Sequence, residues 1–129
     1  MFTISQLKAA HAKVKSGADF PRYIQEIKEF GVMQYTTFVA DGHTIFQGAD
    51  GQEAVGEPKY APLKVAGGAA TEAFQRELKA HQQGKSDYLT FCRQSAAAGV
   101  HLWRVDLVDL TCTYLDTQGR EMLVEQIPA

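Results

Sequence analysis

The sequence of 129 residues predicts an α+β fold, a single domain built from two tandem helix–helix–strand–strand–strand units. Three observations support this prediction. Apolar residues recur at helical spacing in four segments, runs rich in β-branched and aromatic residues follow each helical pair, and the two halves match in register. We expect the first unit at residues 3–57, a linker at 58–69 and the second unit at 70–127.

The first unit opens with two expected helices. Thr3 is a suitable N-cap for a helix that runs to about Ser16, where Gly17 would end it. The second helix lies in ADFPRYIQEIKEFG, with Asp19 as its N-cap and Gly31 as a left-handed stop. Both helices carry an apolar face that has to be buried.

Three expected strands follow these helices. VMQYTTFVA is rich in β-branched and aromatic residues, Asp41-Gly42 is a strong hairpin signal, and HTIFQG returns as the second strand. Asp50-Gly51 turns the chain again before a short third strand in QEAVG. A lone unit of about 60 residues would be marginally stable, so we expect it to pack against another.

A shift of 68 positions maps the first half onto the second without a gap from residue 19 to residue 57. Gly31 then falls on Gly99 and Tyr35 on Trp103, and every aromatic residue between 87 and 114 meets an aromatic residue. The matches lie at caps, helix stops, turns and aromatic core positions, which is the pattern of an internal duplication. The alternative is that two similar units share turn and cap chemistry without a common origin.

The second unit predicts helices at 70–83 and 87–98 and strands near 100–108, 110–116 and 120–127. EPKYAPLKVAGGA joins the units; two prolines and a Gly-Gly pair mark it as a linker, with PLKVA as a candidate short strand. We expect the units to pack together as one α+β domain, with a pseudo-twofold axis as one possible arrangement.

Composition excludes several classes of protein. A net charge of -2 and a pI of about 6.1 argue against a nucleic-acid partner. No apolar run is long enough to span a bilayer and the N-terminus does not resemble a signal peptide, so we expect no membrane partner and a cytoplasmic location. Cys92 and Cys112 lie in apolar patterns, which predicts buried free thiols. We expect no cofactor.

The candidate ligand-binding residues are two aromatic and two histidine side chains, and we expect no catalytic residue. Tyr35 and Trp103 are the matched aromatics of the two first strands, and strand alternation places His101 beside Trp103. His43 stands at the expected hairpin tip. These four could line a cleft between the units. The alternative is that the aromatics are core and that His43 faces solvent.

Two further histidines occupy similar positions near helix ends. His11 and His81 could converge across a pseudo-twofold axis as a metal or pH-sensitive pair. The alternative is two separate histidines, each near the C-terminus of its own helix, where positive charge is favourable. Two histidines alone are a weak metal signal, so we expect no metal site.

Four segments resemble the YdfO-like family of small bacterial and prophage-encoded proteins: HAKVKSGADFPRYIQEIKEFGV, TFVADGHTIF, LKAHQQGKSDYLTFCRQSAAAGV and VDLVDLTCTYLD. The resemblance covers residues 4–128. It implies a domain of unknown function found in prophage regions, with members sometimes labelled phage envelope protein, and it brings no catalytic residues. Because we expect neither a membrane segment nor a secretion signal, we do not expect an envelope role for this chain.

We therefore expect a cytoplasmic, prophage-type accessory or binding protein that is not an enzyme. Its partner would be an unknown protein or a small ligand, and the chain would be a monomer or homodimer. The alternative is a small-ligand-binding or catalytic domain with an aromatic and histidine pocket between the two units.

Overall fold

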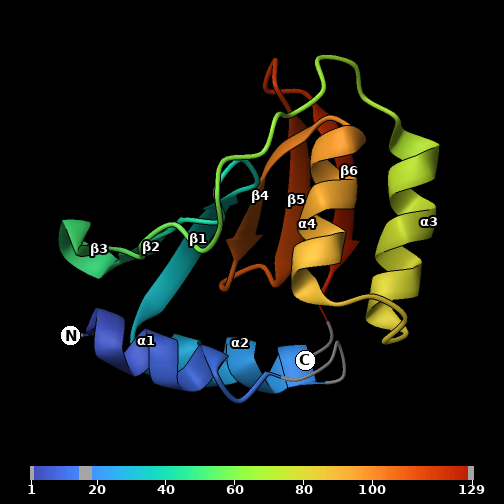
Figure 1. Cartoon of the computed structure of the whole chain (residues 1–129). Coiled ribbons are helices and arrows are strands. Elements are labelled where there is room, and N and C mark those ends of the chain that lie inside the picture. The colour runs from blue at the N-terminus through green and yellow to red at the C-terminus, as the bar shows by residue number, and fades with distance from the viewer. Residues whose placement is uncertain (1, 15–18, 128–129) are drawn as a thin grey trace.

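The computed structural model describes residues 2–14 and 19–127 and confirms the α+β fold class (Figure 1). The helices of this part of the chain are α1 (Ile4–His11), α2 (Phe20–Glu29), α3 (Thr71–Gln82) and α4 (Tyr88–Ala97), with a short 3-10 turn, η2 (Ala49–Gly51). The strands are β1 (Val32–Phe38), β2 (Thr44–Gly48), β3 (Glu53–Val55), β4 (Val100–Asp106), β5 (Thr111–Asp116) and β6 (Glu121–Gln126).

The strands form one antiparallel sheet in the order β3-β2-β1-β4-β5-β6. The first strands of the two halves, β1 and β4, therefore pair at its centre. Each half adds its remaining strands outward, so the blue-to-green and orange-to-red strands of Figure 1 form opposite wings. The core of the molecule is thus shared by both halves.

The register of the central pair is unchanged when the two halves are exchanged. Thr36 pairs with Arg104, and a shift of 68 positions maps the first of these residues onto the second. A pseudo-twofold axis therefore passes between them. The pairs that flank it, one on each side, convert into each other by the same shift; they are Tyr35 with Val105 and Thr37 with Trp103.

Backbone irregularities repeat at the same spacing. Each first strand has a bulge one residue after its start, between Val32 and Gln34 and between Val100 and Leu102. Left-handed backbone angles also recur at matched positions: Gly31 and Gly99 (φ 104 and 88), Gly42 and Leu110 (76 and 56), and Gly51 and Gly119 (77 and 79). These matches support the predicted duplication, while the common origin of the halves stays a prediction.

The helices lie on one face of the sheet (Figure 1). Tyr23 of α2 contacts Tyr35, Phe91 of α4 contacts Trp103, and Phe74 of α3 contacts Tyr114. α1 packs beside α2. Paired strand residues point to the same side of a sheet, so these contacts define a single helix-facing side. The opposite side carries no helix in the described part of the chain.

The first helix is shorter than predicted. Thr3 caps it as expected, with its side chain accepting a hydrogen bond from the backbone of Gln6 in a capping box. The helix nevertheless ends at His11: the next backbone bonds, from Lys13 to Ala10 and from Val14 to His11, are tight turns. Lys13 also forms an ion pair with Glu26 of α2 at 2.9 Å. The predicted end at residues 16 and 17 lies outside the described residues.

The linker contains no strand within PLKVA. Its backbone groups bond to other parts of the chain instead: Leu63 N–H donates to the carbonyl of Ala40, and Ala66 N–H donates to that of Ala96. The linker therefore acts as a strap, residues 57–70, that touches the first hairpin at one end and the end of α4 at the other. It fixes the two halves against each other without joining the sheet.

Candidate functional site

Tyr35 and Trp103 occupy matched places in two buried chains of aromatic rings. In the first half the successive rings are His11, Tyr23, Tyr35 and Phe46, with centroids 5.4, 6.4 and 5.5 Å apart. In the second half they are His81, Phe91, Trp103 and Tyr114, at 4.4, 5.8 and 6.2 Å. Tyr35 is 5% exposed and Trp103 is 8% exposed. Burial raises the pKa of the Tyr35 hydroxyl well above its usual value, so this group stays neutral.

Each of the two helix-end histidines has its own set of neighbours. The His11 ring makes edge contacts with Tyr23 and Tyr88, and burial, aided by the positive charge of Lys59, lowers its pKa to about 4. His81 stacks on Phe91, and its Nδ1 lies 3.0 Å from the carbonyl oxygen of Ser86. These separate settings fit two independent histidines better than a converging pair.

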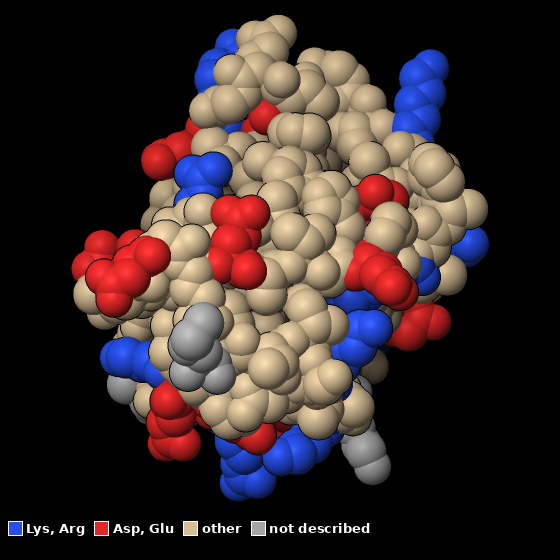
Figure 2. Space-filling model, turned by 90° about the vertical axis from the view of Figure 1, so that its left-hand side faces the viewer, with Lys and Arg blue, Asp and Glu red and all other residues tan. Residues whose placement is uncertain are grey.

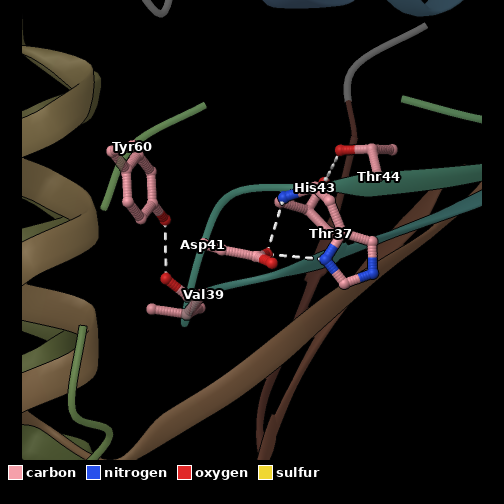
Figure 3. A network of polar contacts seen from close by, with 6 residues as sticks. All are labelled: Thr37, Val39, Asp41, His43, Thr44 and Tyr60. Carbon is pink, nitrogen blue, oxygen red and sulfur yellow. Dashed lines mark hydrogen bonds and ion pairs between the residues drawn. The ribbon is translucent and has the colours of Figure 1, made fainter. Parts of the chain in front are cut away.

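The tip of the first hairpin holds a carboxylate and an imidazole in direct contact (Figure 3). Oδ1 of Asp41 accepts a hydrogen bond from the backbone N–H of His43 at 3.0 Å and lies 2.6 Å from Nδ1 of its ring. These bonds, the backbone one first, hold the pKa of Asp41 below its usual value. The His43 ring stacks on Phe38 at 4.5 Å, and Figure 3 shows its other nitrogen pointing away from Asp41.

His101 joins this hairpin group rather than the aromatic core. Its ring makes an edge contact with Phe38 at 5.8 Å. Phe38 pairs with Leu102 and so faces away from Trp103. The sequence pattern predicted His101 beside Trp103, but the bulge after Val100 interrupts the alternation at that residue.

The structure therefore divides the four candidate residues into two groups. Tyr35 and Trp103 lie on the helix-facing side, while His43 and His101 flank Phe38 on the other. A carboxylate beside an imidazole can orient the ring through a hydrogen bond. Among the described residues, no group of three or more His, Cys, Asp or Glu side chains is placed to hold a metal ion. The hairpin group can thus make a hydrogen bond and a stacking contact.

The strap contributes two residues that the sequence did not indicate. The Tyr60 hydroxyl donates to the carbonyl of Val39 at 2.6 Å (Figure 3), and its ring packs on Gly42, where an added Cβ would lie 2.7 Å from Cε2 of Tyr60. The ammonium group of Lys59 lies 5.5 Å from the centre of the Tyr88 ring. No local pattern in a proline-containing linker reveals such long-range contacts.

The two cysteines are buried and free, as predicted. Cys92 is 0% exposed, and burial raises the pKa of its thiol, although nearby tyrosine hydroxyls partly oppose this effect. Burial raises the pKa of Cys112 to about 12. Both thiols remain protonated near neutral pH and are poor nucleophiles.

The side of the sheet opposite the helices is termed here the open face. Its middle row runs across all six strands and consists of Val55, Ile45, Thr36, Arg104, Thr113 and Val124. On one side of this row lie Phe38, Leu102, Leu115 and Glu121, of which Leu102 and Leu115 are buried. On the other lie Glu53, Gln47, Gln34, Asp106, Thr111 and Gln126. The open face is therefore mainly apolar on one side of the middle row, apart from Glu121, and polar on the other.

Two pockets lie elsewhere on the molecule. A groove of about 390 Å³ lies between the end of α2 and the η2 turn, and it is lined by Phe30, Gly31, Ala49, Asp50, Gly51 and Gln52. A small pocket of about 70 Å³ lies between α1 and α2. Neither pocket is lined by Tyr35, Trp103, His101 or His43.

Arg104 is the feature of the open face that the sequence analysis missed. Strand alternation sets it on the side opposite Trp103, and the shift of 68 positions makes it the counterpart of Thr36. These two signals could have assigned it to a sheet face, but not to the centre of the sheet, because they do not show that its strand pairs with β1. They also could not show that this face carries no helix in the described part of the chain.

The fold and its surfaces define a small α+β domain with helices on one side of an antiparallel sheet and an exposed second side. The family model described as "Protein of unknown function (DUF1398)" matches residues 8–126, and the chain belongs to this family. A comparison with curated proteins found no match. No helix in the described ranges has the length and apolar character needed to cross a membrane. Function therefore has to be argued from the surface and the site.

Proposed function

We propose that this protein is a non-enzymatic binding or accessory protein of the cytoplasm that acts through its open face. The observation that carries the proposal is a six-stranded sheet whose helices, over residues 2–14 and 19–127, cover one side alone. Val55 and Val124, near the two ends of the middle row, are 55% and 49% exposed. An uncovered sheet face with exposed apolar side chains is a reasonable place for a partner to bind. The prophage type rests on the resemblance of the sequence to the YdfO-like family.

The surroundings of the Cys92 thiol and of the His43 ring support a function without catalysis. The Cys92 thiol is buried with a raised pKa, and the contacts of His43 are with Asp41 and Phe38 rather than with a hydroxyl or thiol. A nucleophile normally needs an adjacent base and an accessible position. The aromatic side chains are similarly engaged in packing.

The cytoplasmic location is supported by the cysteines. Both thiols are free and buried, which suits a reducing compartment, where disulfides are rare. The mixed surface charge also argues against nucleic acid: in Figure 2, acidic and basic side chains intersperse around a largely uncharged surface.

Site-specific photocross-linking in bacterial cells tests the binding function. A photoreactive phenylalanine analogue is placed at Val124 or at Val55 on the open face, with Gln75 on the exposed side of α3 as the matched control. We expect a discrete cross-linked protein from both open-face positions and none from the control. The same pattern from all three positions, or no product from any, would contradict the proposal.

Small-ligand binding at the hairpin tip is a second candidate function. It is favoured by the cluster of His43 and His101 around Phe38, with one nitrogen of His43 directed away from Asp41 (Figure 3). If this is the function, a metabolite library should contain a compound that raises the melting temperature of the wild type but not of His43→Ala. The variant Lys79→Ala on exposed α3 serves as the control.

A further inference from the structure

The strap is the longest segment without helix or strand in the described part of the chain. It crosses from β3 to α3 by way of the first hairpin and the end of α4, as the green trace of Figure 1 shows. A connection of this length without regular structure is uncommon within a domain, and those that occur are usually lids, binding loops or disordered linkers. Backbone bonds at both ends order this one, which favours the first two of these roles.

Few contacts hold the strap in place. Besides the backbone bonds at its two ends, it is anchored by the side chains of Tyr60, Leu63 and Val65, which are half-buried against the core. No residue of the strap is buried, and no ion pair among the described residues involves it. A segment with few buried apolar contacts opens at a lower free energy than the whole domain unfolds.

The strap nevertheless forms one wall of a buried polar cluster at the junction of the two halves. The thiol of Cys92 on α4 is 0% exposed, and the hydroxyls of Tyr60 and Tyr88 interact with it. The Tyr88 ring meets the ring of His11 at 6.2 Å, and the ammonium group of Lys59 lies 5.5 Å from its centre. Figure 3 shows Tyr60 between α4 and the hairpin. Removal of the strap would therefore take both Lys59 and Tyr60 away from the thiol.

The same segment braces the tip of the first hairpin. The backbone N–H of Lys59 donates to the carbonyl of Asp41 at 2.8 Å, and the Tyr60 hydroxyl donates to the carbonyl of Val39 at 2.6 Å. The Tyr60 ring also fills the space beside Gly42. Movement of the strap would thus act on the hairpin tip and on the Cys92 cluster together.

We propose that the strap is a latch that opens as a unit while the sheet and the helices stay folded. When it is closed, it shields the Cys92 thiol and braces the hairpin tip. When it is open, the thiol meets solvent and the tip loses its support. The contrast between the half-buried contacts of the strap and the fully buried thiol beneath it supports this inference. The latch does not rest on the proposed binding function.

The second cysteine provides an internal reference for the latch. Cys112 on β5 is 6% exposed, slightly more than Cys92, and its thiol interacts with Tyr114 and Glu125 rather than with the strap. In a rigid fold, Cys112 would react with a thiol reagent at least as fast as Cys92. If complete unfolding alone exposed the thiols, the two would react at the same rate. A latch makes Cys92 the faster of the two.

Thiol labelling of the full chain tests the latch. N-ethylmaleimide is added in native buffer, and peptide mass spectrometry gives the initial rate at each cysteine. We expect Cys92 to react at least about tenfold faster than Cys112. The rate at Cys92 should depend weakly on urea, because local opening exposes little surface, whereas the rate at Cys112 should rise steeply.

Variants of the hairpin and the strap then test which segment moves. Gly42→Ala places a Cβ 2.7 Å from Cε2 of Tyr60, whereas Gly51→Ala, the matched control, has nearly the same φ (77 against 76) and no atom within 4 Å. Gly42→Ala should raise the ratio of the two labelling rates at least about threefold, and Gly51→Ala should leave it unchanged. Tyr60→Phe, which removes the bond to Val39, should raise the ratio at least about twofold. This variant gives the answer if Gly42→Ala fails to fold.

Several results would overturn the latch. Equal rates at the two cysteines would mean that complete unfolding exposes both, and a faster Cys112 would mean that static exposure decides. A urea dependence at Cys92 as steep as that at Cys112 would exclude local opening. A ratio that Tyr60→Phe leaves unchanged, or that Gly51→Ala raises as much as Gly42→Ala does, would show that another segment opens.

Discussion

The backbone N–H of Val39 donates to the carbonyl of His101 at 3.0 Å, just beyond the end of β1. The same bond recurs at the other end of the central pair, where Leu107 donates to Met33 at 2.9 Å. A shift of 68 positions converts one bond into the other. The two halves are thus joined by a symmetric ladder that includes the residues just outside the strands.

Alanine at the two matched helix stops should have unequal effects. Gly31→Ala places a side chain at a φ of 104, with Phe2 the nearest group at 4.0 Å, and should lower the free energy of unfolding by about 1–2 kcal/mol. Gly99→Ala adds a clash with the Gly68 carbonyl oxygen, 2.4 Å from the new Cβ, and should cost about 1–3 kcal/mol more. Urea unfolding measures both. Equal losses in the free energy of unfolding would show that the strap leaves room for a side chain at residue 99.

Acid should destabilise the fold through His11. Its pKa is lowered from 6.5 to about 4, so the unfolded chain binds a proton between these values that the folded chain does not. Stability is full above pH 6.5 and should fall by roughly 2 kcal/mol as the pH drops to 4, less than the whole shift implies because the ring is partly exposed. His11→Gln should flatten this part of the profile. An unchanged slope in the variant would assign the effect to other groups.

The two helix-end histidines should act independently. His11 and His81 contact different aromatic rings, Tyr23 and Phe91. In a double-mutant cycle, His11→Ala and His81→Ala should therefore couple by less than about 0.5 kcal/mol. A larger coupling, or stabilisation by zinc that is lost in both single variants, would support the converging pair instead.

The aspartate that stabilises the hairpin turn should occupy a different position in each half. Asp41 accepts the His43 backbone bond in the first hairpin, whereas Asp106, rather than the matched Asp109, accepts such bonds in the second. Asp41→Ala and Asp106→Ala should each cost about 1 kcal/mol, and Asp109→Ala less than about 0.5. Thermal or urea unfolding ranks the three. A larger loss at Asp109 than at Asp106 would contradict the assignment.

Much of the fold could be predicted because nearby residues determine where its helices begin and end and where its hairpins turn. Thr3 caps α1, Gly31 and Gly99 adopt left-handed angles after the second helix of each half, and Gly42 turns the first hairpin. Each depends on neighbouring residues alone. The pairing of β1 with β4 does not, because strand patterns do not specify which strands meet.

The candidate site was harder to predict because it depends on contacts between distant segments. The bulge after Val100 has no sequence signature, and it places His101 against Phe38. Tyr60 reaches Val39 from a segment with no regular structure. Alternation could place Arg104 opposite Trp103, yet the choice of covered side depends on where the helices pack.

The strap has a consequence for how two chains could combine. It is bonded to both halves, through Lys59 N–H to the carbonyl of Asp41 and Ala70 N–H to that of Ala98. The β1–β4 ladder itself does not require that both strands belong to one chain. Chains whose straps are released can exchange their second halves, each β4 pairing with the β1 of the other molecule in the same register. Such an interlocked dimer would reuse the contacts between the two halves outside the strap and would create a new interface only at the hinge.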